Sequence, residues 1–234
     1  RSGQGSAVYY CKIRTIDANS EISGFSKLSD FSNRIRSPHI SIGKSGTVYV
    51  VWSAPAGSEY TINLAILGKG KNRIFKKIVS PRSLLNNPSV LPAERYGDLF
   101  LAWTEQGSHP QTKQIKFTKI SDFKTAKGNI ITIAQTGIGV DIDRRPQLLE
   151  GRNSENVYLI SNGIPEIGSY ENSACFLAEI DKNDISVEIK PLIQSDMSLL
   201  SETFGCFVSP ETICLCWVKS SRRKSSEIWY GQFG

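Results

Sequence analysis

Charged side chains stand immediately ahead of several apolar segments in the sequence. The carboxylates among them could supply an acid, and the arginines a positive charge, so together they could recognise a polar ligand. The plainer alternative is that they are solvated turn charges that keep the ends of strands in water. The candidate ligand-binding residues are Arg34, Arg36, Asp141, Asp143, Arg144, Arg145 and Glu202.

The two histidines add little catalytic context. His39 lies within an alternating apolar segment and His109 in a Gly-Ser-His-Pro loop, and neither has a second histidine or a Ser-His-Asp pattern nearby. No glycine-rich phosphate loop leads from a strand into a helix. The sequence therefore predicts no catalytic triad, no metal site and no cofactor.

The elements that would position the charged residues are short strands in a repeated pattern. In the first two copies a proline opens an alternating segment, and a β-branched or apolar run closes on tryptophan 14 or 15 positions later. The copies run from Pro38 to Trp52, from Pro88 to Trp103 and from Pro146 to Ser161, where serine replaces tryptophan. A fourth copy keeps Trp217 but lacks the proline. Because the tryptophan recurs once per copy, we expect it to pack between repeats.

A second pair of strands follows each hairpin, which gives four short antiparallel strands over about 50 residues, the period of a propeller blade. A β-sandwich would not explain the repeat, and the repeat of a β-solenoid would be shorter. We therefore predict an all-β fold, a β-propeller of four or five four-stranded antiparallel blades in a single domain, 1–234. The expected units are 1–30 (partial), 37–80, 87–134, 145–190 and 203–234 (partial).

The strand count does not balance at the two ends. The N-terminal unit supplies the last two strands of a blade and the C-terminal unit the first three. Either the ends form separate incomplete blades, or the chain is part of a longer propeller. The first residue is Arg1 and no signal peptide is visible, so we expect a processed product or a fragment and assign no compartment. In a propeller the candidate charged residues would lie at the mouth of the central channel.

The repeat also carries a family resemblance. Pro38-His-Ile-Ser-Ile42, a glycine turn and Val48-Tyr-Val-Val-Trp-Ser53 resemble the blade pattern of the sialidase-like, BNR-type β-propeller proteins. Members often carry an Asp-box, Ser-x-Asp-x-Gly-x-x-Trp/Phe, between the third and fourth strands. The matching places here are residues 17–20, 68–75 and 181–184, and none holds a complete box.

The resemblance implies a role for some of the arginines. Enzymes of that family use arginines at such places, in a motif resembling Arg-Ile-Pro, to hold a substrate carboxylate. The partial matches are Arg34-Ile-Arg-Ser-Pro38 and Arg144-Arg-Pro146. A hydrolase would also need an acid, such as Asp141 or Asp143, and a nucleophile at the same mouth.

Composition excludes several classes of protein. The chain has 234 residues, 21% of them charged, and no apolar run of the roughly 20 residues that a membrane helix needs. The net charge of +6 comes from basic residues scattered in short groups without interleaved aromatics, which argues against nucleic-acid binding. We therefore expect no nucleic acid and no membrane span, and a glycan or a protein as the partner.

Five cysteines are an odd number without a Cys-x-x-Cys pair, so a zinc site is disfavoured. Cys214 and Cys216 share one face of a strand because the side-chain period is two, and Cys206 on the neighbouring strand could face one of them. A bridge among these three is one interpretation. The favoured one is that the cysteines are small buried hydrophobes.

Three functions fit these features. The degenerate turns and the missing acid–base constellation favour a non-catalytic, lectin-like binding module for a carbohydrate or a protein partner. The alternatives are a sialidase-like glycoside hydrolase that uses Arg36 and Arg145 to hold a carboxylate, and a structural segment of a larger surface or assembly protein.

Overall fold

The computed structural model is all-β in the residues that it describes. These are residues 6–11, 13–16, 19–22, 24–29, 35–57, 59–68, 73–80, 84–93, 98–106, 113–121, 128–136, 145–151, 155–163, 174–194, 199–209, 212–220 and 227–233. A search of this part of the chain finds no helix of the length and hydrophobicity needed to cross a membrane.

Three sheets contain four antiparallel strands each, in chain order from one edge to the other. The first is β5 (Arg36–Ile42), β6 (Val48–Ala56), β7 (Glu59–Leu67) and β8 (Arg73–Ser80). The second is β9 (Leu85–Ala93), β10 (Asp98–Gln106), β11 (Lys113–Ile120) and β12 (Ile130–Thr136). The third is β13 (Gln147–Glu150), β14 (Asn156–Gly163), β15 (Ala174–Asp181) and β16 (Val187–Gln194).

The turn between β5 and β6 shows how local sequence sets this order. The Gly43 N–H donates to the Thr47 carbonyl oxygen at 2.8 Å, and the Gly46 N–H donates to the Gly43 carbonyl oxygen at 2.9 Å. Gly46 has φ 78°, a conformation that glycine adopts without a Cβ penalty. A tight antiparallel connection of this kind makes consecutive strands neighbours.

The two ends of the chain lie in separate sheets. At the C-terminal end, β17 (Leu199–Phe207), β18 (Ile213–Ser220) and β19 (Glu227–Phe233) form a three-stranded sheet. At the N-terminal end, β1 (Tyr9–Tyr10) pairs with β4 (Ser26–Lys27), and β2 (Ile13–Ile16) pairs with β3 (Asn19–Ile22). In the described residues the strands of the two chain ends do not pair with one another.

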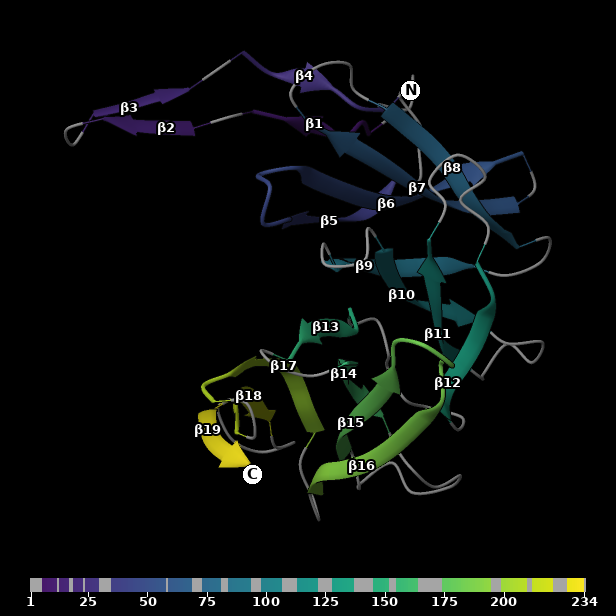
Figure 1. The fold of residues 1–234 in the computed structure, drawn as a ribbon, viewed down its shortest axis with the longest axis vertical. Helices are drawn as coiled ribbons and strands as arrows, with labels where there is room; N and C mark the ends of the chain where they lie inside the picture. Colours follow the sequence, from purple (N-terminus) through teal and green to yellow (C-terminus); the bar gives the residue numbers. More distant parts are fainter. Residues whose placement is uncertain are drawn as a thin grey trace.

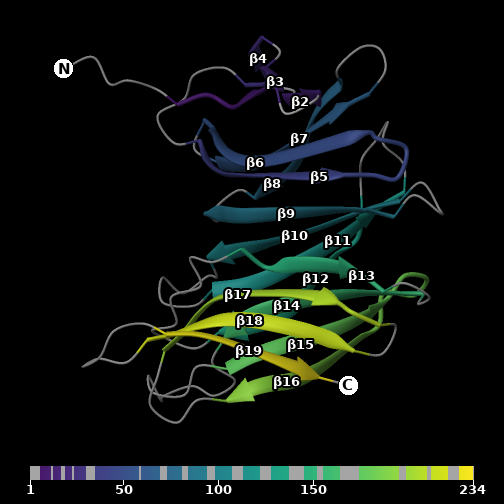
Figure 2. The ribbon, with the colours of Figure 1, turned by 90° about the vertical axis from the view of Figure 1, so that its left-hand side faces the viewer.

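The sheets follow one another around an arc, with β5, β9, β13 and β17 toward its inside and β8, β12 and β16 toward its outside (Figure 1). Seen from the side, the inner strands follow one another downward in the order β5, β9, β13, β17 (Figure 2). Repeated four-stranded antiparallel sheets around a common axis define a β-propeller. The predicted fold class is confirmed.

The hydrophobic core lies between successive sheets. One cluster joins the N-terminal hairpin to the first sheet, and further clusters join the first sheet to the second, the second to the third, and the third to the last. Trp52, Trp103 and Trp217 are all buried in these layers. The prediction that the repeated tryptophan packs between blades is confirmed.

Candidate functional site

The residues that precede the repeated prolines come together near the propeller axis. Ser37 at the start of β5 donates from Oγ to Asn87 Oδ1 of β9 at 2.7 Å. Arg145, which stands just before β13, donates from Nη2 to the carbonyl oxygens of Ser37 at 3.1 Å and Pro38 at 2.9 Å. Positions in three different blades therefore form one group, which we call the pre-proline cluster: Ser37, Asn87 and Arg145.

Two members of the pre-proline cluster have a left-handed backbone. Ser37 and Asn87 both have φ 51°, a region that side chains with a Cβ rarely occupy. The strand pairing is irregular at the same places, between Arg36 and His39 and opposite residues 102–104. Such strain costs on the order of 1–3 kcal/mol per residue and is often found where a structure holds a site in place.

Hydroxyl groups support both irregular segments in the same way. Ser53, directly after Trp52, donates from Oγ to the Arg36 carbonyl oxygen at 3.4 Å. Thr104, directly after Trp103, donates from Oγ1 to the Asn86 carbonyl oxygen at 3.1 Å. The hydroxyl residue that follows the tryptophan thus bonds to the carbonyl two positions before the proline in both blades.

The inner strands of the third and last sheets are also joined through side chains. Gln147 donates from Nε2 to the Gly205 carbonyl oxygen at 2.9 Å, and its Oε1 accepts from the Gly205 N–H at 2.7 Å. A Cβ at Gly205 would lie 2.6 Å from both Ile160 Cδ1 and Leu215 Cδ2. Glycine at this position therefore permits the close approach of β17 to the third sheet.

His39, next to the pre-proline cluster, is a titratable group with a strongly shifted pKa. Its Nδ1 accepts a hydrogen bond from the Val90 N–H at 3.3 Å, so in the neutral ring the proton is on Nε2. Burial and, to a smaller extent, the positive charge of Arg145 lower the pKa of His39 from 6.5 to about 4. Burial also lowers the pKa of the Arg145 guanidinium, which stays protonated. At neutral pH the His39 ring is therefore uncharged and can donate from Nε2.

We expect His39 to make the protein less stable as the pH falls from 7 to 5. Its pKa is lower in the folded chain than in the unfolded chain, so the unfolded chain binds more protons between about pH 4 and pH 6.5. The loss should be about 1–2 kcal/mol in urea unfolding at the two pH values. His39→Gln keeps an acceptor for the Val90 N–H and does not titrate, so an equally steep pH dependence in this variant would contradict the assignment.

A pocket of about 610 Å³ lies beside His39. It is lined on one side by residues 6–11, which include Tyr9 and Tyr10 of β1, and on the other by Ile35, Pro38, His39, Ile40 and Val50. Pockets of this size suit small-molecule ligands. The tyrosines offer flat apolar surfaces with polar ends, and His39 offers a neutral hydrogen-bonding ring.

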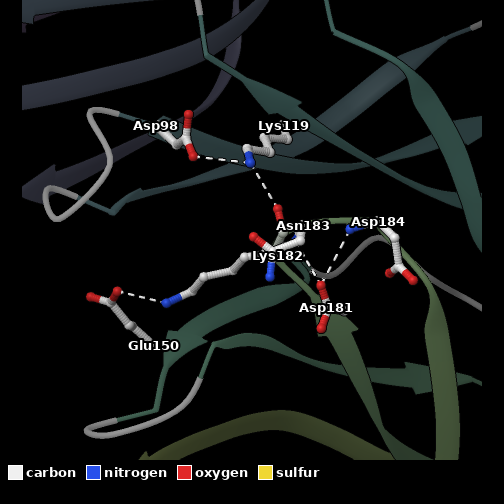
Figure 3. Close-up of polar contacts among 7 residues, drawn as sticks. All are labelled: Asp98, Lys119, Glu150, Asp181, Lys182, Asn183 and Asp184. Atoms are coloured by element: carbon white, nitrogen blue, oxygen red, sulfur yellow. Dashed lines mark hydrogen bonds and ion pairs between the residues drawn. The ribbon is translucent and has the colours of Figure 1, made fainter.

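The best-defined carboxylate network lies at the other end of the inner strands. Asp98 pairs in register with Ala93 at the end of β9, and its carboxylate is 3.1 Å from Lys119 Nζ. Lys119 Nζ also donates to the Lys182 carbonyl oxygen at 2.7 Å, and Lys182 Nζ lies 2.9 Å from Glu150 Oε1 (Figure 3). The hydrogen bond from Lys119 to the Lys182 carbonyl oxygen links the second sheet to the third, and the ion pair on each side of it lies within one sheet. Asp98 and Glu150 are therefore engaged by lysines away from the pre-proline cluster.

The sequence-derived candidates are distributed as follows. Arg145 joins the pre-proline cluster, Arg36 begins β5 and is exposed, and Glu202 lies in the irregular stretch of β17 between Ser201 and Phe204. Arg34, Asp141, Asp143 and Arg144 lie outside the described residues.

Sequence reasoning missed Ser37, His39 and Asn87 as site residues. The signal for Ser37 and Asn87 was their equivalent place, directly before the repeated proline.

No protein-family model matches the chain, and no curated protein matches its sequence. Solved structures do match, at low identity. An N-acetylgalactosamine deacetylase from F. plautii, in complex with blood group B trisaccharide, is 11% identical with a TM-score of 0.52 over 80% of this chain. The match covers 64% of that protein, so this chain spans less than two thirds of its length.

Two arabinanases align over more of the chain with lower TM-scores. An exo-1,5-α-L-arabinanase from a bovine ruminal metagenomic library is 14% identical with a TM-score of 0.47, over 99% of this chain and 94% of that one. The GH43 endo-arabinanase from Bacillus licheniformis is 13% identical with a TM-score of 0.44, over 98% and 88%. At these identities the similarity concerns the fold alone, and the repeated four-stranded antiparallel sheets of this chain define that fold as a β-propeller.

Proposed function

We propose that this protein is a non-catalytic β-propeller module that binds carbohydrate in the pocket between β1 and β5. The observation that carries the proposal is the pocket itself, because it combines two tyrosines with a neutral histidine. Aromatic faces pack on the apolar side of a sugar ring, while hydroxyl and imidazole groups hydrogen-bond to its hydroxyls. A ligand of this chemistry needs no charged partner in the protein.

Within the residues that the structure describes, the arrangement of the charged groups supports binding over catalysis. Arg145 donates from Nη2 to the backbone carbonyl oxygens of Ser37 and Pro38. These two hydrogen bonds hold the start of β5 in place. Asp98 and Glu150 pair with lysines at the far end of the inner strands. A glycoside hydrolase would need two carboxyl groups flanking the scissile bond.

The choice of carbohydrate over a protein partner has separate support. The deacetylase with a similar fold was solved with a bound trisaccharide. Membership of the sialidase-like, BNR-type family is part of the same proposal. Its support is the turn between β15 and β16, the Asp-box position, where Asp181 Oδ1 accepts hydrogen bonds from the N–H groups of Asn183 at 2.6 Å and Asp184 at 3.2 Å.

We expect a glycan array to identify a ligand and calorimetry to show that Tyr9→Ala weakens its binding at least tenfold, or about 1.4 kcal/mol. The matched control is Tyr230→Ala in β19, which removes an exposed tyrosine far from the pocket and should bind normally. Absence of glycan binding, or equal binding by the Tyr9 variant, would contradict the proposal. Cleavage of a fluorogenic sialoside that is lost in Arg145→Ala would instead identify a hydrolase.

A further inference from the structure

Three of the five cysteines lie on one face of the last sheet. Cys206 of β17 is directly opposite Cys214 of β18, and Cys216 lies two residues further along β18, opposite Phe204. All are free thiols, and Cys206 and Cys216 are exposed while Cys214 is partly buried. The interpretation of the cysteines as small buried hydrophobes is therefore wrong for Cys206 and Cys216, because no described sheet covers this face.

The register brings Cys206 and Cys214 close together. The N–H and C=O of the adjacent Gly205 point away from β18, since both bond to Gln147. At the turn, the Val208 N–H donates to the Thr212 carbonyl oxygen at 3.0 Å. Because hydrogen-bonded pairs alternate along an antiparallel ladder, Cys206 and Cys214 form such a pair, with Cα atoms about 5.5 Å apart. This Cα separation is close to the most frequent value in disulfides, about 5.5–6 Å. The Cβ atoms of a hydrogen-bonded pair are about 5.5 Å apart, so they must approach by roughly 1 Å for the bond to form.

Cys175 provides a contrast within the same chain. It is fully buried in the core between the third and last sheets. Burial raises the pKa of its thiol to about 12, so it carries almost no thiolate at neutral pH. An oxidant in solution therefore reaches Cys206 but not Cys175.

We propose that Cys206 and Cys214 are a redox-active dithiol, which a low-molecular-weight disulfide such as glutathione disulfide converts into a cross-strand disulfide bond. The Cys206 thiolate attacks one sulfur of glutathione disulfide and releases one glutathione. The Cys214 thiolate then attacks Cys206 Sγ in the mixed disulfide and releases the second. The dithiol loses two electrons and two protons, and one glutathione disulfide becomes two glutathione thiols.

The sheet favours the second step over a lasting mixed disulfide. The hairpin turn between β17 and β18 already holds the two thiols side by side, so the attack is intramolecular and has a high effective concentration. The bond would fix β17 to β18 one residue from Gly205, which holds Gln147 of the third sheet. Formation of the disulfide would therefore constrain β17, a strand that also borders the propeller axis.

The test is titration of the whole reduced protein with glutathione disulfide, followed by denaturation and labelling with a maleimide. We expect the number of labelled thiols to fall from five to three, with no glutathione adduct in the intact mass. Cleavage after Glu211 separates Cys206 from Cys214. The bond should then appear as two peptides that part only on reduction.

Three serine variants decide between this bond and other oxidation products. Cys206→Ser and Cys214→Ser should each stop at a mixed disulfide or stay reduced, whereas the matched control Cys216→Ser should form the bond as the wild type does. A bond that persists in Cys206→Ser or Cys214→Ser overturns the proposal. A stable glutathione adduct on the wild-type protein, or a disulfide-linked dimer in place of the internal bond, also overturns it.

Discussion

Replacing Trp103 with alanine should lower the free energy of unfolding by about 3–5 kcal/mol. The indole is completely buried between the first and second sheets, in a cluster with Val51, Ile62 and Leu101. Truncation removes its contacts with both sheets and leaves a cavity that a paired β-sheet cannot close by collapse. A β-propeller has this kind of interface at every blade, so one such loss is a large fraction of a typical stability of about 5–15 kcal/mol.

Two further variants test whether the loss of stability depends on the burial of the tryptophan or on the residue type alone. Trp103 Nε1 is buried without a hydrogen-bond partner, so Trp103→Phe removes an unsatisfied donor and should cost only about 1–2 kcal/mol. Trp229→Ala removes a tryptophan that is 45% exposed on the last sheet and should cost less than about 1 kcal/mol. Urea unfolding followed by far-UV circular dichroism measures all three. Equal losses for Trp103→Ala and Trp229→Ala would refute the interblade account.

Removing the carboxylate of Glu150 should destabilise the protein by about 2–4 kcal/mol. Glu150→Ala leaves the Lys182 ammonium, whose side chain is only 5% exposed, without the carboxylate 2.9 Å away. Removing one partner of a poorly solvated ion pair is expensive, although Glu150 is itself 25% exposed and water can replace it in part. The Glu150–Lys182 pair lies within the third blade, beside the hydrogen bond from Lys119 to the Lys182 carbonyl oxygen that joins this blade to the second (Figure 3).

A double-mutant cycle tests that interpretation. Lys182→Met keeps the apolar stem and removes the charge, so Glu150→Ala should cost much less in that background. The matched control is Glu188→Ala, because Glu188 pairs with Lys190 at 3.5 Å on the surface, and its loss should cost under about 0.5 kcal/mol. If Glu150→Ala costs the same with and without the Lys182 charge, the destabilisation does not come from the lost ion pair.

Much of the fold could be predicted because its signals are local. A proline at the start of an alternating segment, a glycine turn and a β-branched run closing on tryptophan each specify a strand or a hairpin within a few residues. Repetition of that unit then implied a propeller, since equivalent positions must pack in equivalent ways.

The candidate site was less predictable, because it depends on contacts between distant blades. Arg145 and Ser37 are 108 positions apart, and only the packing of the blades around the arc brings the guanidinium to that carbonyl oxygen. Irregular strand pairing also changes which face a side chain occupies, and an alternating pattern cannot show where one residue has been added to a strand. For the same reason, the alternating pattern predicted that His39 is an ordinary strand residue, although burial lowers the pKa of its side chain.

The cysteines show the same division most directly. The sequence by itself determined that Cys214 and Cys216 share a face and that Cys206 lies on the neighbouring strand, because the side-chain period of a strand is two. Only the tertiary structure decided that this face is exposed while Cys175 is buried. The periodicity of a strand defines its two faces, but which of them meets water depends on whether another sheet packs against it.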